Sequence, residues 1–74
     1  METYVDVYLN VDGEKASVIH NKLIKLELKP TIGEHDFVHD WKGIVSIEEE
    51  LKFIENIQSA LKGTKAILKF KTIR

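Results

Sequence analysis

Two stretches of strict alternation constrain the fold of this chain most. Residues 4–11 alternate polar and apolar side chains, and residues 66–71 repeat the pattern near the other end. A period of two is typical of a strand that buries one face. We therefore expect a strand in each region. In the first strand, the side chains expected to face the core are Val5, Val7, Leu9 and Val11.

Apolar residues between these strands follow helical spacing instead. They recur three or four positions apart from Ala16, which predicts a helix with Asp12 as its N-cap. A second helix is predicted from Ser46, whose capping box includes Glu49, to a stop at Gly63. Its expected buried stripe consists of Ile47, Leu51, Ile54, Ile57 (or Gln58) and Leu61, widened by Phe53 and Ala60.

The middle of the chain allows two interpretations. Pro30 excludes a helix that runs through it, and residues 36–41 alternate again. We expect a hairpin with strands near 26–32 and 36–42 and a turn at Gly33. The alternative is that residues 25–33 extend the first helix, which would leave one strand in this region.

The resulting order of elements is β-α-β-β-α-β in one domain, residues 1–74. This order resembles that of ferredoxin-like α+β domains: a two-layer split βαβ fold with an antiparallel sheet and two helices on one face. The resemblance covers the whole chain and implies that the first and third strands are central. It implies no activity, because this fold hosts many unrelated functions.

Composition excludes several functional classes. The absence of cysteine excludes disulfides and thiolate metal sites. No apolar run approaches the length of a membrane helix, and no secretory signal is visible, so we expect a cytoplasmic protein without membrane contact. The net charge of −1 makes nucleic acid an unlikely partner. Ten lysines, one arginine and abundant Ile and Glu suit a heat-adapted or archaeal source, or an AT-rich genome.

The expected fold leaves one face of the sheet open. Acidic residues of the first and third strands would face lysines of the last strand there, and we expect cross-strand charge pairing. The candidate binding residues of this face are Tyr4, Asp6, Tyr8, Asp36, Asp40, Lys69 and Lys71.

A second candidate site is a ligand loop formed by Gly33, His35, His39 and Trp41. We expect His35 to be a solvated turn residue and His39 to be partly buried with one hydrogen bond. No metal site is expected, because on one strand the two histidines would lie ~13 Å apart. No catalytic residues are assigned, since the serines lie in helices or at a cap.

The sequence therefore favours a non-catalytic interaction or assembly module without a cofactor. Its partner would be another protein or a second copy of the chain, bound through the open sheet face or an edge strand. A regulatory domain that binds a small molecule is the alternative. RNA binding, and an enzyme that uses His39 with Asp36 or Asp40, are lesser alternatives.

Overall fold

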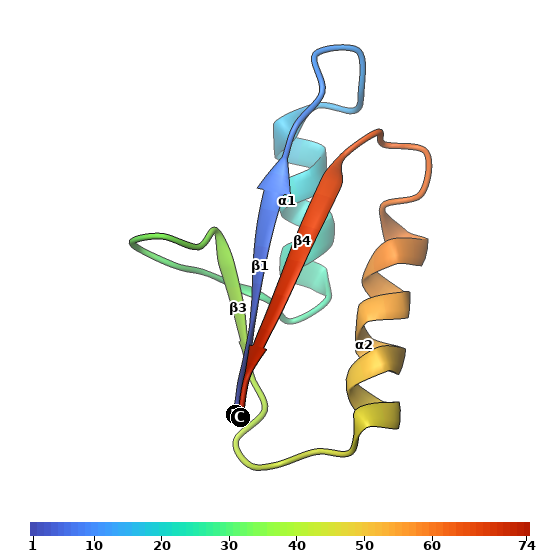
Figure 1. The fold of residues 1–74 in the computed structure, drawn as a ribbon. Coiled ribbons are helices and arrows are strands. Elements are labelled where there is room, and N and C mark those ends of the chain that lie inside the picture. Colours follow the sequence, from blue (N-terminus) through green and yellow to red (C-terminus); the bar gives the residue numbers. More distant parts are fainter.

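The computed structural model describes all 74 residues, and its elements follow the predicted order (Figure 1). The strands and helices are β1 (Glu2–Tyr8), α1 (Ala16–Lys25), β2 (Lys29–Pro30), β3 (Phe37–Asp40), α2 (Ile47–Ala60) and β4 (Ile67–Ile73). Neither helix is long and apolar enough to cross a membrane.

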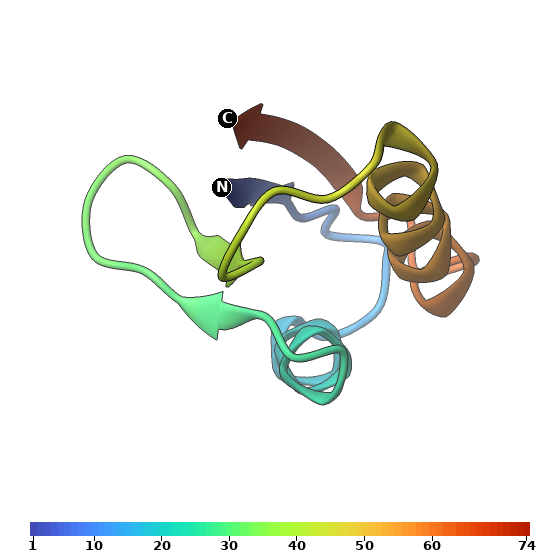
Figure 2. The same cartoon turned by 90° about the horizontal axis from the view of Figure 1, so that it is seen from below.

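The four strands form one antiparallel sheet in the order β2-β3-β1-β4. β1 and β3 are central, as predicted, and both helices lie on the same side of the sheet (Figure 2). Glu2 is paired with Ile73, so the two ends of the chain lie side by side. The predicted α+β fold with two helices on one face is confirmed.

β1 is shorter than predicted. It ends at Tyr8, which is paired with Ile67, the first residue of β4. Beyond this pair no neighbouring strand continues the ladder, and Val11 is 98% exposed in the turn that follows. The prediction that Leu9 and Val11 face the core was therefore wrong, since alternation persists in the sequence after strand pairing has ended.

The start of α1 also differs from the prediction. Lys15, not Asp12, is the N-cap, and its side chain makes no capping bond. The backbone N–H of Asp12 donates instead to Asn10 Oδ1 within the preceding turn. A side chain on Gly13 would meet the carbonyl oxygen of Thr64 at 2.4 Å, so only glycine fits where this turn packs on the far end of the chain.

The middle of the chain matches neither interpretation fully. α1 ends at Lys25, and Glu27 reverses the chain with a φ of 69°. Leu28 then enters the core. β2 contains only two residues at the edge of the sheet, and Pro30 suits this position because its nitrogen points away from β3 and no ladder hydrogen bond is lost. The hairpin exists, but its loop, residues 31–36, extends beyond the sheet (Figure 1).

α2 begins as predicted, with Ser46 Oγ accepting the N–H of Glu49 at 3.2 Å. Gly63, with a φ of 86°, turns the chain after the helix. The predicted buried stripe was wrong in its first half, because Ile47 is 61% and Leu51 51% exposed. Only the second half of α2 and its C-cap, Leu61, contribute to the core. The core consists of Val5, Ile19, Leu23, Leu28, Phe37, Ile57 and Leu61.

Candidate functional site

Six of the seven residues predicted to form the open face share that face. The β1–β4 register puts Asp6 opposite Lys69 and Tyr4 opposite Lys71. Tyr4 is also paired with Val38 of β3. Alternation along these strands then places six of the predicted residues away from the helices, namely Tyr4, Asp6, Tyr8, Asp40, Lys69 and Lys71. The seventh, Asp36, precedes β3, and its carboxylate is directed to the backbone N–H of Val7. The role of all seven in binding stays a prediction.

A chain of polar contacts ties the loop 31–36 to β1. His35 Nδ1 lies 3.1 Å from Asp6 Oδ1, which also accepts the backbone N–H of Asp36 at 3.2 Å. The carboxylate of Asp36 in turn accepts the N–H of Val7 at 2.8 Å. His35 is therefore an anchored residue, and the expectation that it is a solvated turn residue was wrong.

The lysines of the open face form no ion pair. The two ion pairs of the structure join His35 to Asp6 and Arg74 to Glu50. The expected cross-strand charge pairing is absent, because the aspartates accept hydrogen bonds from His35 and the backbone instead. Lys69 and Lys71 are exposed and remain free to interact with an outside partner.

Both the ring and the hydroxyl of Tyr4 contact other side chains of the protein. Its ring lies 4.6 Å from that of His35, at an angle of 30°, and its hydroxyl donates to Glu2 Oε1 at 3.0 Å. This hydrogen bond raises the pKa of Tyr4, and partial desolvation and the charge of Glu2 act in the same direction. Since His35 covers the ring, Tyr4 does not offer the free aromatic surface on which RNA bases would stack.

The four residues of the predicted ligand loop form no single site, since only His39 and Trp41 contact each other. Gly33 lies at the loop tip, and His35 contacts the open face. His39 is paired with buried Thr3 and, like Trp41, faces the helices. The two histidines do not lie on one strand, because β3 starts at Phe37.

His39 belongs to an aromatic cluster under the helices. Its ring stacks on Phe53 at 4.3 Å and meets Trp41 edge-on at 4.6 Å. Both lie along a hollow of about 410 Å³ between the end of α1 and α2. The expected hydrogen bond of His39 is not formed within the chain. Asp40 lies on the opposite face of the sheet and the carboxylate of Asp36 is bound to the N–H of Val7, so the acid–base pair considered for His39 is not assembled.

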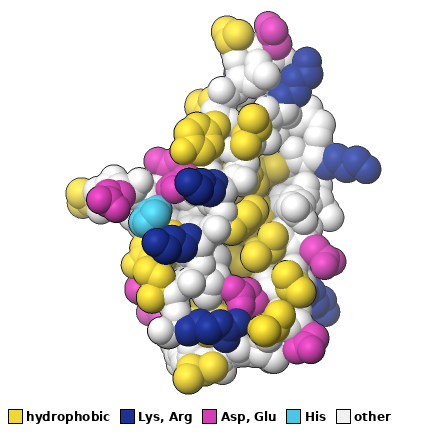
Figure 3. All heavy atoms as spheres, viewed as in Figure 1, with side chains coloured by type: hydrophobic (Ala, Val, Ile, Leu, Met, Phe, Trp, Pro, Cys, Tyr) yellow, Lys and Arg dark blue, Asp and Glu magenta, His cyan; other side chains and the backbone are white.

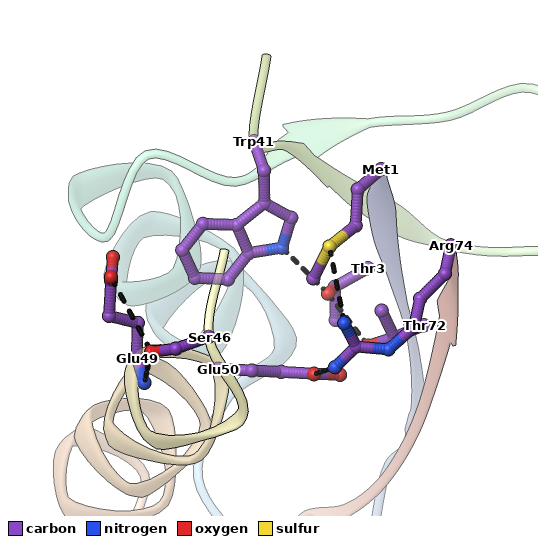
Figure 4. A network of polar contacts seen from close by, with 8 residues as sticks. All are labelled: Met1, Thr3, Trp41, Ser46, Glu49, Glu50, Thr72 and Arg74. Atoms are coloured by element: carbon purple, nitrogen blue, oxygen red, sulfur yellow. Dashed lines mark hydrogen bonds and ion pairs between the residues drawn. The ribbon is translucent and has the colours of Figure 1, made fainter. Parts of the chain in front are cut away.

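Trp41 is held by a network that joins both ends of the chain (Figure 4). Its indole N–H donates to Thr3 Oγ1 at 2.9 Å, and Thr3 Oγ1 lies 2.8 Å from Thr72 Oγ1. Thr3 is fully buried. Nearby, Arg74 binds Glu50 and so connects the end of β4 to α2.

The outer edge of β4 carries unpaired backbone groups. The N–H of Trp41 donates to the carbonyl of Met1, which shows that odd-numbered residues of β1 bond toward β3. In an antiparallel ladder the even-numbered residues then bond toward β4, where they meet residues 67, 69, 71 and 73. The N–H and C=O groups of Leu68, Phe70 and Thr72 therefore point outward. No strand lies beyond them.

The exposed apolar side of α2 runs beside this edge. Helical spacing puts Ile47, Leu51, Ile54 and Gln58 on one stripe. Gln58 lines a hollow together with Leu68 and Phe70 of β4, which places the stripe along β4. Figure 3 shows hydrophobic side chains in the band between β4 and α2. We call the outer edge of β4 together with this stripe the β4–α2 groove.

Charge is distributed unevenly around the groove. Residues 62–74 contain five basic residues and no acidic residue, which gives a formal charge of +5. The rest of the chain then carries −6, since the net charge is −1. Arg74 is paired with Glu50, whereas the four lysines of this segment form no ion pair.

The β4–α2 groove was not predicted from the sequence, although part of its signal is present there. The positive charge of residues 62–74 is visible in the sequence. The exposure of the first half of α2 could be predicted only by knowing where the sheet ends. No three His, Asp or Glu side chains converge at a point where a metal ion could bind. Comparisons with protein-family models, with curated proteins and with solved structures find no match to this chain.

Proposed function

We propose that this protein is a non-catalytic binding module that takes up an extended segment of a partner protein as an additional strand beside β4. The observation that carries the proposal is the row of outward backbone groups at Leu68, Phe70 and Thr72. Such a row is a template for another strand.

The neighbouring helix supports the same function. An added strand points alternate side chains toward the helix layer, where Ile47 and Leu51 are more than half exposed. Burying these side chains would contribute apolar contact in addition to the backbone hydrogen bonds. Natural sheets protect such an edge by covering it, keeping it short or placing lysines on it. β4 is seven residues long and uncovered, and Lys69 and Lys71 are the protection that it carries.

The proposal of a non-catalytic role is supported by the separation of the reactive groups. His35 is engaged with Asp6 on the open face, and His39 lies among aromatic rings on the other face. Neither imidazole has a hydroxyl among its hydrogen-bond partners, and a base in contact with the nucleophile is what nucleophilic catalysis by a hydroxyl would require.

A proline substitution tests this function at the edge itself. Leu68→Pro removes one outward N–H without removing a β1–β4 hydrogen bond, and Leu68→Ala removes the same side chain but keeps the N–H. The probe is the blocked peptide Thr-Val-Gln-Val-Gln-Val-Thr, titrated into 15N-labelled protein. Its sequence is the same in both directions, so either strand orientation can form.

We expect the peptide to protect the amides of Leu68, Phe70 and Thr72 from exchange. It should bind Leu68→Pro at least about fivefold more weakly than Leu68→Ala, which corresponds to the loss of about one hydrogen bond. Equal binding by the two variants, or peptide-induced changes elsewhere in the protein only, would contradict the proposal.

The hollow beside His39 favours a second candidate function, the binding of a small molecule. Its walls include Trp41 and Phe53, and the free imidazole of His39 supplies a polar group. An apolar pocket with one placed polar group is typical of ligand sites. A panel of aromatic metabolites that changes Trp41 fluorescence in the wild type but not in His39→Ala would support this candidate.

A further inference from the structure

We propose that the partner segment alternates acidic and apolar residues, with acidic side chains on the side of Lys69 and Lys71. The inference rests on the proposed function, because it specifies the chemistry of the strand that would add to β4. It is carried by a separate observation, the charge on the two sides of that edge.

The side chains of β4 divide into two sets. Leu68, Phe70 and Thr72 point toward the helices, whereas Lys69 and Lys71 point to the open face. An added strand keeps the same alternation, so its residues beside the two lysines lie on the open face. Its remaining residues lie over the apolar stripe of α2.

Acidic residues suit the positions of the added strand that lie beside Lys69 and Lys71. Neither Lys69 nor Lys71 has an ion-pair partner within the chain, and the nearest acidic side chain across the ladder, Asp6, is bound to His35. Lys62 and Lys65 line the hollow on the helix side of β4, together with Leu68 and Phe70. The acidic residues of an added strand would therefore meet two unpaired lysines, Lys69 and Lys71, which favours its association over that of a neutral strand.

A second copy of the chain fits this edge poorly. Antiparallel pairing of β4 with itself about Phe70 puts Lys69 opposite Lys71 of the other copy, and this happens twice by symmetry. Like charges directly opposite each other destabilise a strand pair. The two lysines thus disfavour the centred homodimer and favour an acidic partner.

Three blocked peptides that differ only at two positions test the inference. They are Thr-Val-Glu-Val-Glu-Val-Thr, the Gln peptide described above, and the corresponding Lys peptide. Binding is followed by amide protection along β4. We expect the Glu peptide to bind about tenfold more tightly than the Gln peptide, as two favourable cross-strand charge pairs would give. The Lys peptide should bind most weakly, and the difference should shrink with added salt.

Charge reversal provides the matched control. Lys69→Glu combined with Lys71→Glu should make the Lys peptide the tightest binder. Lys15→Glu combined with Lys29→Glu makes the same change in net charge at the N-cap of α1 and in β2 at the opposite edge, and should leave the original order intact.

The outcomes separate the inference from the proposed function. If the Gln and Glu peptides bind β4 equally, the acidic preference is wrong and the strand-binding function stands. If no peptide protects the β4 amides, both are wrong. Protection that depends on protein concentration without peptide would mean that β4 pairs with a second copy, which would overturn the acidic preference.

Discussion

Thr3 and Thr72 face each other across the β1–β4 ladder with their Oγ1 atoms 2.8 Å apart, and Thr3 also accepts the indole N–H of Trp41. One buried hydroxyl thus joins β1, β4 and the segment after β3. Thr3 occupies a core-facing position of a sheet whose other central core residue in β1, Val5, is aliphatic. Its polar atom is tolerated because both neighbours satisfy it.

Thr3→Val should destabilise the protein although it keeps the shape of the side chain. The substitution leaves the Trp41 N–H and the Thr72 hydroxyl without their partner. Unpaired buried polar groups cost about 1–3 kcal/mol each. Urea unfolding monitored by Trp41 fluorescence should show this loss as a lower midpoint with an unchanged slope.

Thr72→Val is the matched control, since it removes only the second contact of Thr3. We expect a smaller loss of stability than for Thr3→Val. The double variant should be less destabilised than the two single losses added together, because the substitutions remove one shared contact. Strict additivity would indicate that the two hydroxyls act independently.

The two halves of α2 should respond differently to truncation. Ile57 is fully buried, so Ile57→Ala should cost about 2–5 kcal/mol. Leu51 is 51% exposed, so Leu51→Ala should cost less than about 1 kcal/mol. Thermal unfolding of both variants measures the contrast. A large loss from Leu51→Ala would mean that the first half of α2 packs more tightly than described.

Amide exchange along β4 should alternate in the free protein. Residues 69 and 71 donate their N–H groups to β1, and should exchange slowly. The backbone N–H groups of Leu68, Phe70 and Thr72 point to the outer edge of the sheet, and should exchange much faster. Hydrogen exchange measured residue by residue by NMR tests this pattern. Uniform protection along the strand would show that the outer edge is already covered in solution.

Tyr4 should contribute to the alkaline limit of stability. Its folded-state pKa lies above the usual value of a tyrosine, about 10, so Tyr4 contributes stability that is fully present below that pH. The contribution is lost as pH rises from the unfolded-state pKa through the folded-state pKa. Across this range the unfolding free energy should therefore fall less steeply in Tyr4→Phe than in the wild type.

Glu2→Gln offers a check on the cause of this effect. It keeps a side-chain acceptor for the Tyr4 hydroxyl but removes the negative charge. The tyrosinate absorbance should then develop at lower pH than in the wild type. An unchanged titration would assign the shift to the hydrogen bond and desolvation alone.

The strand faces could be predicted from the sequence because alternation is a local property. Val5, Phe37 and Phe70 face the helices, as the period of two required. The order of the strands also followed, since short right-handed crossovers allow few arrangements. Strand lengths could not be predicted, because β1 ends where its neighbours end.

The candidate site was less accessible to sequence reasoning. The apolar stripe of α2 correctly includes Ile57 and Leu61, but the pattern does not tell how far along the helix the core extends. Leu51 was therefore assigned to the core although it lies at the surface. His35 was misplaced for a related reason, since its partner Asp6 lies 29 positions away in the chain.

The pairing of Glu2 with Ile73 makes the two ends of the chain adjacent strands. The β1–β4 ladder is thus the least local contact in the sequence, and its formation requires closing nearly the whole chain into a loop. A circular permutant that joins residue 74 to residue 1 through a short turn would convert this ladder into a hairpin. With new ends in the loop 31–36, the same sheet would then be assembled starting from the pair of strands that the natural chain order brings together last.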